Sequence, residues 1–505
     1  MNATQPIKGW NPLNRLPIDY YRLNFRLLSR LVGLTMMALS VLMLLPMLVS
    51  ACYHEGALSG LAASAGIMGG AGAAMYFIFG RKANYNLPER DSFWVTTVVW
   101  LLVPLAGVLP YMLTGSIDNF TDAAFESMSG FTTTGASVIE YPEDLSKGML
   151  LWRSMTQWLG GLGLILMLIA LVKDLQAGGY RLYEAEFSGT VQKKLHPHIS
   201  KSVSLMWRIY VGITLALLLG LIICGNNVVE SMCLSLSTIS TGGFMTRSTG
   251  MTGFNAGSML LVTLFMFESG INVALVYQLV TLKGRMLWND EEFRVYVATY
   301  FSAVAICVAA LLIEGNHIDE SIWYSLFHVA STISTCGFYI DSPQHWSLWV
   351  SAITFVLIFV GASAGSTGGG LKLKRVMILA KYVRNFFLKM LHPNAVFTVR
   401  IGSNIVAVDY INKIFGFVFM YLMFVAMGAF VLTLCGSDIP NAVCMAATNI
   451  SNLGPSPLLN NLGANMDYIR LSGVAKWTLM ILMMAGRLEV FAVVAVFTPA
   501  YWRKR

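Results

Sequence analysis

Long apolar runs constrain this chain more than any other feature of its sequence. Segments of about 20 mostly apolar residues recur along all 505 positions, and each is long enough to cross a hydrocarbon core of about 30 Å. Only 12% of the residues are charged, whereas a soluble protein carries about 25%. The chain is therefore predicted to be an all-α polytopic membrane protein. The expected spans lie near residues 31–51, 57–80, 92–113, 149–172, 208–224, 256–282, 295–313, 347–380, 411–434 and 473–499.

Basic residues indicate the orientation of these spans. With the N-terminus inside, 28 of the 34 lysines and arginines fall in the inner connections and tails, as the positive-inside rule requires. These segments are 1–30, 81–90, 173–208, 283–294, 372–413 and 503–505. The outer connections are acidic, which could concentrate cations at a pore mouth. The same excess would also follow simply from basic residues being kept inside, and both interpretations remain open.

Four short polar stretches, each ending in or containing glycine, lie in every second connection. Each follows about twelve residues of helical character, which make about 18 Å of helix and cannot cross a bilayer. The chain must therefore enter the membrane from outside, turn and return. The stretches are Thr132, Thr133, Thr134 and Gly135; Ser240, Thr241, Gly242 and Gly243; Ser334, Thr335, Cys336 and Gly337; and Ser451, Asn452, Leu453 and Gly454.

The repetition of these stretches suggests one site with four walls. Non-helical backbone at membrane depth is tolerated only where protein encloses it or it lines a water-filled cavity. Carbonyl oxygens aimed at a common axis can replace the hydration shell of a cation, and glycine allows the positive φ that such an arrangement needs. Helix C-termini aimed at the same point add partial negative charge. The alternative is four polar loops that merely pack between helices, which the shared order of helix, polar stretch and glycine disfavours.

A second glycine-rich segment interrupts the span that begins near residue 347. A continuous helix over 347–384 would be about 56 Å long, far beyond the membrane core, and consecutive glycines disfavour helix. We therefore expect a break within 361–370. The segment lacks the G-x-x-x-x-G-K-[ST] order of a nucleotide-binding loop. A packing seam of small residues remains an alternative to a functional loop.

Once the charges assigned to the inner and outer connections are set aside, three charged residues remain within the predicted spans: Glu268, Arg487 and Glu489. A charge at this depth is costly and normally faces a partner or a water-filled cavity. Glu489 points about 200° away from Arg487 on a helix, so it is a poor direct partner. Arg487 is instead expected to meet carbonyls of the 361–370 segment or to line the cavity, although a purely structural anchor remains open. Glu268 receives no role.

These motifs resemble the superfamily of bacterial Trk and Ktr and plant HKT cation-transporting subunits, most closely the TrkH type. The resemblance covers about residues 92–500 and includes the local segments 361–372, 392–396 and 486–491. It implies four pseudo-repeats of outer helix, re-entrant pore helix with filter, and inner helix around one pore, after two leading transmembrane helices. The implied boundaries are 1–91 for the cytoplasmic N-terminus and leading helices, 92–172 for repeat 1, 208–282 for repeat 2, 295–384 for repeat 3 with its intramembrane gate loop, and 411–505 for repeat 4.

The resemblance also implies a function. The expected activity is potassium uptake across the bacterial inner membrane, with both termini cytoplasmic, K⁺ as the transported ion and no organic cofactor on this chain. The filter would consist of the sixteen residues of the four stretches. The implied gate beneath it comprises Gly365, Ser366, Thr367, Gly368, Gly369, Gly370 and Arg487.

Expected partners come from the same resemblance. Family members form homodimers and are controlled by a cytoplasmic nucleotide-binding subunit of the TrkA type, and this chain carries no G-x-G-x-x-G signature of its own. The basic inner loops 173–208 and 372–400 could dock that subunit or attract anionic lipid headgroups. Nucleic acid is not an expected partner, because the basic residues are spread over several loops.

Alternatives to a potassium pore remain. Gly135 matches a potassium-preferring filter, since some plant relatives that favour Na⁺ have serine there. Cys336 and Asn452–Leu453, however, depart from the threonine-rich pattern of the other walls. A Na⁺-permeable pore, or a secondary transporter coupled to H⁺ or Na⁺, is therefore a second possibility. An intramembrane enzyme is disfavoured, because no cluster of His, Cys, Asp and Glu falls at mid-membrane.

Overall fold

The chain is almost entirely helical, as predicted. The computed structural model describes residues 24–81, 89–164, 199–280, 285–340, 348–454 and 468–502. Its only strands among these residues are a two-stranded antiparallel pair, β1 (Arg400–Ile401) and β2 (Asn404–Ile405). Most of the expected N-terminal cytoplasmic segment, the basic stretch 173–198 and the basic tail 503–505 lie outside the described residues.

Within the described residues, six helical segments are long and apolar enough to cross a membrane. They are the two leading helices and the first helix of each repeat, which confirms the predicted spans there. The leading pair comprises α1 (Phe25–Leu42) with α2 (Leu44–Cys52), and α3 (Ala57–Ala74) with the π-helical η1 (Met75–Gly80). The four outer helices are α4 (Glu89–Ala106) with α5 (Val108–Leu113), α10 (Ile199–Ile223), α15 (Glu291–Ile313) and α19 (Val408–Leu434).

The inner helix of every repeat, which follows the polar stretch in the sequence, ends near the level of the polar stretches. In repeat 1, α7 (Lys147–Leu162) ends at Gly163, whose φ is +103°. The rest of the predicted span 149–172, from residue 165 on, lies outside the described residues. Each of the other three inner helices is followed by a further helix after a break. These pairs are α12 (Ala256–Ser269) and α13 (Val273–Val280), α17 (Leu348–Val360) and α18 (Leu373–Leu391), and α21 (Gly473–Arg487) and α22 (Phe491–Phe497).

The break in repeat 3 confirms the sequence prediction, but the continuous spans predicted over 256–282 and 473–499 are wrong. In repeat 2 the Asn272 side chain accepts a hydrogen bond from the Ala274 N–H and starts a new helix after the break. In repeat 4 Glu489 and Val490 have φ near +54° and +59°, and α21 and α22 meet at 114°. Hydropathy misses both breaks because the residues on either side are equally apolar.

Four short helices enter between the long ones, as predicted from the repeats. They are α6 (Phe120–Phe131), α11 (Val228–Ile239), α16 (Ile318–Ile333) and α20 (Ile439–Ile450). Asn119 and Asn227 cap the first two, because each side chain accepts a hydrogen bond from a backbone N–H in the first helical turn. The C-terminal halves of all four helices are buried, so their ends meet inside the protein.

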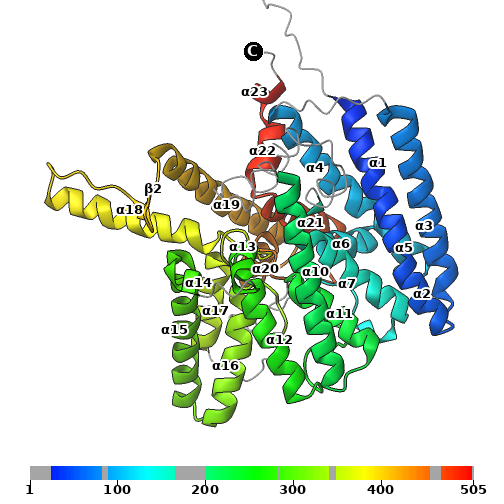
Figure 1. Ribbon diagram of the computed structural model, residues 1–505, viewed down its shortest axis with the longest axis horizontal. Helices are drawn as coiled ribbons and strands as arrows, with labels where there is room; N and C mark the ends of the chain where they lie inside the picture. The colour runs from blue at the N-terminus through cyan, green and yellow to red at the C-terminus, as the bar shows by residue number, and fades with distance from the viewer. Residues whose placement is uncertain are drawn as a thin grey trace, which may run out of the picture.

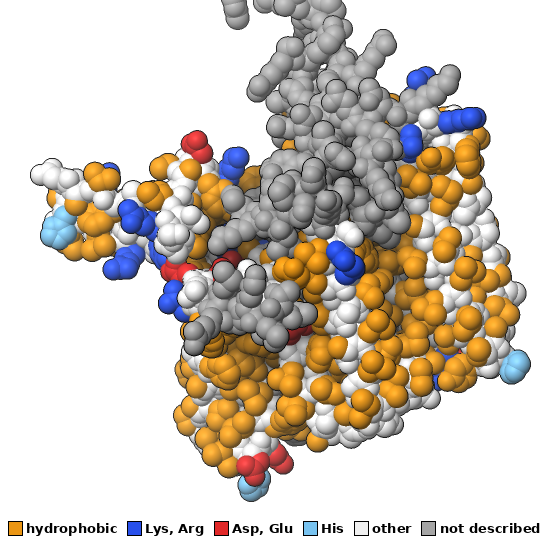
Figure 2. All heavy atoms as spheres, in the orientation of Figure 1, with side chains coloured by type: hydrophobic (Ala, Val, Ile, Leu, Met, Phe, Trp, Pro, Cys, Tyr) orange, Lys and Arg blue, Asp and Glu red, His pale blue; other side chains and the backbone are white. Residues whose placement is uncertain are grey.

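The helices form a bundle from which one arm projects. Helices α1 and α3 pack side by side at one edge, whereas α18 and the β1–β2 turn extend sideways from the opposite edge (Figure 1). Hydrophobic side chains cover much of the face shown in Figure 2. Exposed large hydrophobic residues in the described part of the chain include Leu219, Phe301 and Phe430. A surface of this kind suits contact with lipid tails. The remaining short elements are η2 (Pro142–Asp144), α14 (Arg285–Asn289) and α23 (Pro499–Trp502).

Candidate functional site: four polar stretches, a loop and an arginine

Each of the four short helices α6, α11, α16 and α20 ends in the same backbone motif. The second residue of every polar stretch is left-handed, with φ between +54° and +60° at Thr133, Thr241, Thr335 and Asn452. In the first stretch, the Thr133 and Thr134 N–H groups donate back to the carbonyls of Gly130 and Ser129, at 3.0 and 2.9 Å. The other three stretches repeat this pair of bonds, which defines a Schellman ending. The sequence predicted positive φ only at the glycines, but non-glycine residues carry it too, at the kind of strained position that clusters in functional sites.

The four stretches form a closed ring. The last residues, Gly135, Gly243, Gly337 and Gly454, have φ between +72° and +86°. A Cβ atom added to each would lie 2.1–2.4 Å from the carbonyl oxygen of the third residue in the next stretch. These oxygens belong to Gly242, Cys336, Leu453 and Thr134, in that order. The contacts therefore run from wall 1 to 2, 3 and 4 and back to 1, and the sixteen predicted residues lie together.

The walls share a backbone but differ in their side chains. Leu453 packs against Ile358 and Cys444. The Asn452 amide nitrogen donates to the Thr134 hydroxyl at 3.1 Å and to the Met483 carbonyl at 3.0 Å. The first bond links wall 4 directly to wall 1, and the second ties wall 4 to α21. The different side chains of the four walls thus change the contacts that support each wall, while the backbone conformation of the walls stays the same.

The glycine-rich segment 361–372 lies directly against the inner ends of the walls. The Gly369 N–H donates to the Thr335 hydroxyl at 2.7 Å, and the Thr367 hydroxyl donates to the Ile239 carbonyl at 3.2 Å. A Cβ atom on Gly369 would lie 2.0 Å from the Ser451 carbonyl oxygen. The three residues 367–369 therefore touch the base of walls 2, 3 and 4, and glycine is needed for that approach.

Two residues that the sequence analysis did not single out hold this loop from behind. The Glu292 carboxylate accepts a hydrogen bond from the Ala364 N–H at 2.6 Å, and the Asn272 amide donates to the Ala364 carbonyl at 2.7 Å. Glu292 follows Glu291 at the start of α15, where acidic residues are ordinary helix-terminus chemistry. Asn272 sits at the unforeseen break of repeat 2. Neither position carries a signal that separates it from a common structural role.

Arg487 joins the loop to the wall that the loop does not support. Its guanidinium donates to the Thr367 carbonyl at 3.0 Å and to the Thr133 hydroxyl at 3.3 Å. It also donates to the carbonyls of Gly160 and Gly161, each at 2.5 Å. The expectation that Arg487 meets carbonyls of the glycine-rich loop is confirmed. A cavity of about 20 Å³ bordered by Ser366 and Arg487 lies here, with room for about one water molecule.

Glu489 belongs to a buried ion cluster beside this cavity. It pairs with Lys372 at 3.3 Å and also with Arg375. Both basic residues were assigned to an inner loop from the sequence, but they are only 6% and 2% exposed. The Arg375 guanidinium also lies 4.1 Å from the centre of the Phe417 ring. The cluster joins the start of α18, just after the loop, to the break between α21 and α22.

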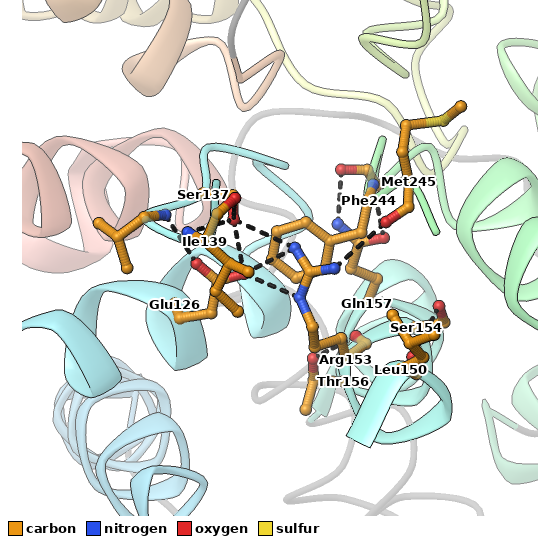
Figure 3. A network of polar contacts seen from close by, with 12 residues as sticks. Glu126, Ser137, Ile139, Leu150, Arg153, Ser154, Thr156, Gln157, Phe244 and Met245 are labelled. Atoms are coloured by element: carbon orange, nitrogen blue, oxygen red, sulfur yellow. Dashed lines mark hydrogen bonds and ion pairs between the residues drawn. The ribbon is translucent and has the colours of Figure 1, made fainter. Parts of the chain in front are cut away.

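A second buried ion pair consists of two charges that the sequence analysis did not place within the spans. Arg153 of α7 and Glu126 of α6 are 2.7 Å apart and almost completely buried (Figure 3). The sequence analysis placed both among the outer connections. Arg153 lies inside the predicted span 149–172, and its position there was the signal in the sequence that it is buried. Glu268, which received no role, lies half-buried near the end of α12.

Other outer acidic residues also have partners. Asp122 pairs with Lys476 at 2.5 Å, which links repeat 1 to repeat 4, and Glu230 pairs with Arg247. The Ser248 hydroxyl donates to Glu143 at 2.6 Å and holds the pKa of that carboxyl below its usual value. Part of the outer negative charge is therefore committed to joining the repeats.

The chain is similar to Trk-system proteins over nearly its whole length. A family described as "TrkH: Cation transport protein" matches residues 71–504. The Trk system potassium uptake protein TrkH of Escherichia coli K12 is 32% identical over 491 residues, covering 95% of this chain and 100% of that protein. The Trk system potassium uptake protein TrkI of Halomonas elongata is 28% identical and covers 94% and 96%. The crystal structure of the potassium transporter TrkH from Vibrio parahaemolyticus matches with a TM-score of 0.85 at 28% identity, covering 95% of this chain and 100% of that one.

Proposed function

Because this chain belongs to the TrkH family of cation transport proteins, we propose that it takes up potassium across the bacterial inner membrane. Its relatives are transport components, so it is a transporter and not an enzyme. The closed ring of four filter walls carries the proposal. Such a ring offers carbonyl oxygens to a dehydrated cation from four sides, while four helix C-termini add partial negative charge. K⁺ is the proposed transported ion, with no organic cofactor on this chain.

The proposed gate is the segment 365–370 together with Arg487. Two observations support it: the loop touches the base of three walls, and Arg487 bridges the loop to the fourth. The space between them holds little more than one water, so an ion leaving the filter would meet a closed path. Transport would require the loop to move away while the filter stays in place.

The proposed assembly follows the relatives. Their printed names describe a Trk system, which suits a chain that works with a partner subunit. We propose a homodimer, a cytoplasmic nucleotide-binding subunit of the TrkA type, and cytoplasmic N- and C-termini. The unequal walls favour a second candidate, a Na⁺-permeable or H⁺- or Na⁺-coupled transporter, because Asn452 and Leu453 replace threonines in wall 4.

Uptake of Rb⁺ and Na⁺ into cells that lack other potassium-uptake systems tests the function. The parent protein should carry Rb⁺ in preference to Na⁺. Gly135→Ser should lower Rb⁺ uptake and raise the relative Na⁺ uptake, because any Cβ at this position would press against the Gly242 carbonyl. Cells with an empty vector set the background. A parent protein that is present in the membrane but carries no Rb⁺ would contradict the potassium assignment.

A further inference from the structure

One side chain behind the filter holds wall 2 at two places. Gln157 of α7 donates its amide N–H to the Gly242 carbonyl at 2.6 Å. Its amide oxygen accepts hydrogen bonds from the Phe244 N–H at 3.2 Å and from the Ser237 hydroxyl at 2.6 Å. The Gln157 side chain is fully buried, and Figure 3 shows it beside Phe244. A single amide thus fixes wall 2 before and after its last glycine.

Wall 2 needs such support more than the other three. Its third residue is Gly242, where the other walls have Thr134, Cys336 and Leu453. Two consecutive glycines leave the peptide between them little restricted by side chains. A Cβ atom on Gly242 would lie 2.3 Å from the Gln157 Cδ atom. Gln157 therefore occupies the space of the missing side chain and also holds the Gly242 carbonyl.

The buried ion pair anchors the helix that carries Gln157. Arg153, one turn earlier on α7, donates to Glu126 at 2.9 Å and to the Met245 carbonyl at 3.2 Å. Glu126 in turn accepts from the Val138 N–H at 3.0 Å. Residue 138 lies three positions after the last glycine of wall 1, and residue 245 lies two positions after the last glycine of wall 2. Figure 3 shows Arg153 between Glu126 on one side and Met245 on the other, within one network of polar contacts.

The other repeats build the same fold without this network. The residue six positions before each filter stretch is Glu126 in repeat 1, but Leu234, His328 and Met445 in the others. A Cβ on Gly160 would lie 1.7 Å from the Phe131 carbonyl, and one on Gly486 would lie 1.9 Å from the Ile450 carbonyl. These two contacts make the inner helices of repeats 1 and 4 equivalent. Gln157 and Met483 therefore occupy equivalent positions, because each lies three residues before that glycine. A methionine therefore fits where repeat 1 has glutamine.

We propose that Gln157 is a positioning residue of the filter, which fixes the Gly242–Gly243 peptide and thereby sets the discrimination between potassium and sodium. The proposal rests on the potassium-uptake function proposed above. Without the Gln157 amide, this peptide can rotate, and the Gly242 carbonyl, which closes the ring against Gly135, loses its fixed direction. A smaller and more strongly hydrated ion then loses its disadvantage, since a less rigid ring can adapt to it.

Gln157→Met tests the proposal, because methionine is the residue of the equivalent position in repeat 4. The ratio of Rb⁺ to Na⁺ uptake should fall roughly three- to tenfold, the range expected when a hydrogen bond of ordinary net strength is lost. Gly242→Ala perturbs the same contact from the other side and should lower the ratio in the same direction. Ser154→Ala is the matched control, since this buried hydroxyl on α7 bonds the Leu150 carbonyl of its own helix. The control should keep the parent ratio.

A second measurement separates positioning from general damage. The melting temperature of the purified protein should rise more in KCl than in NaCl for the parent and for Ser154→Ala, and this difference should shrink in both test variants. Unchanged uptake ratios in both variants, or failure of both to fold, would overturn the positioning role. If the parent itself carries no Rb⁺, it is the proposed function that fails. If the parent carries Rb⁺ and both variants keep its ratio of Rb⁺ to Na⁺ uptake, the proposed function stands and only the positioning role of Gln157 fails.

Discussion

Arg487 makes contacts that an apolar residue of similar length cannot make. Four of its hydrogen bonds end on Thr133, Thr367, Gly160 and Gly161, so it ties the loop to wall 1 and to α7. Arg487→Met should raise Rb⁺ uptake severalfold, because the loop loses this tie while the filter keeps its shape. Uptake in cells at matched amounts of membrane protein measures the effect.

Arg487→Lys provides the control for that prediction. Lysine keeps the charge but lacks the planar fork that reaches several acceptors at once, so uptake should fall between the parent and the methionine variant. The alternative left open by the sequence is a structural anchor. Loss of folded protein in both variants, with no rise in uptake, would favour that alternative over a gate.

The sequence revealed some of these residues and concealed others for a physical reason. A lone arginine in an apolar span is conspicuous because burying it is costly, and four glycines after short helices are conspicuous by repetition. Gln157, Asn272 and Glu292 are individually ordinary. Their roles depend on partners 85, 92 and 72 residues away, and only the folded chain brings those partners together.

The glycine-rich loop is the element on which the gate proposal depends. Residues 367–369 contact walls 2, 3 and 4. Deleting these three residues should raise Rb⁺ flux strongly, because the base of the filter is left uncovered. If the segment is instead a packing seam between helices, the same deletion should abolish expression of the protein, and no rise in flux should be seen. Flux and membrane abundance measured on the same cells distinguish the two outcomes.

The helical elements were predictable to different extents. The outer helices and the short pore helices followed from run length and repetition. Only the break in repeat 3 was foreseen, because three consecutive glycines mark it in the sequence. The breaks after Ser269 and Arg487 depend on Asn272, Glu489 and Val490, residues without strong breaking propensity. Tertiary contacts, such as the Glu489 pairs with Lys372 and Arg375, stabilise a backbone that local preference does not.

The proposed filter depends on the whole molecule, since its walls come from residues 132 to 454 and their ring closes only when all four repeats are in place. An ion bound at their centre would contact every repeat and would therefore stabilise the folded chain as a unit. Stabilisation by a ligand grows as RT ln(1 + [L]/Kd), about 2.7 kcal/mol at a hundredfold excess over Kd. The melting temperature of the purified protein should therefore rise with KCl and RbCl, more than with NaCl at equal concentration.

Choline chloride supplies the control for ionic strength in that experiment, because it screens surface charge without entering a carbonyl site. Gly135→Ser should reduce the potassium-dependent rise, since a side chain there forces walls 1 and 2 apart. Asp122→Asn should lower the melting temperature equally in all four salts, because its ion pair with Lys476 joins repeats 1 and 4 away from the filter residues themselves. Equal melting temperatures for the parent in KCl, NaCl and choline chloride would contradict a potassium site shared by the four repeats. A rise that is equal for KCl and NaCl would favour the Na⁺-permeable alternative, in which the unequal walls adapt to both ions.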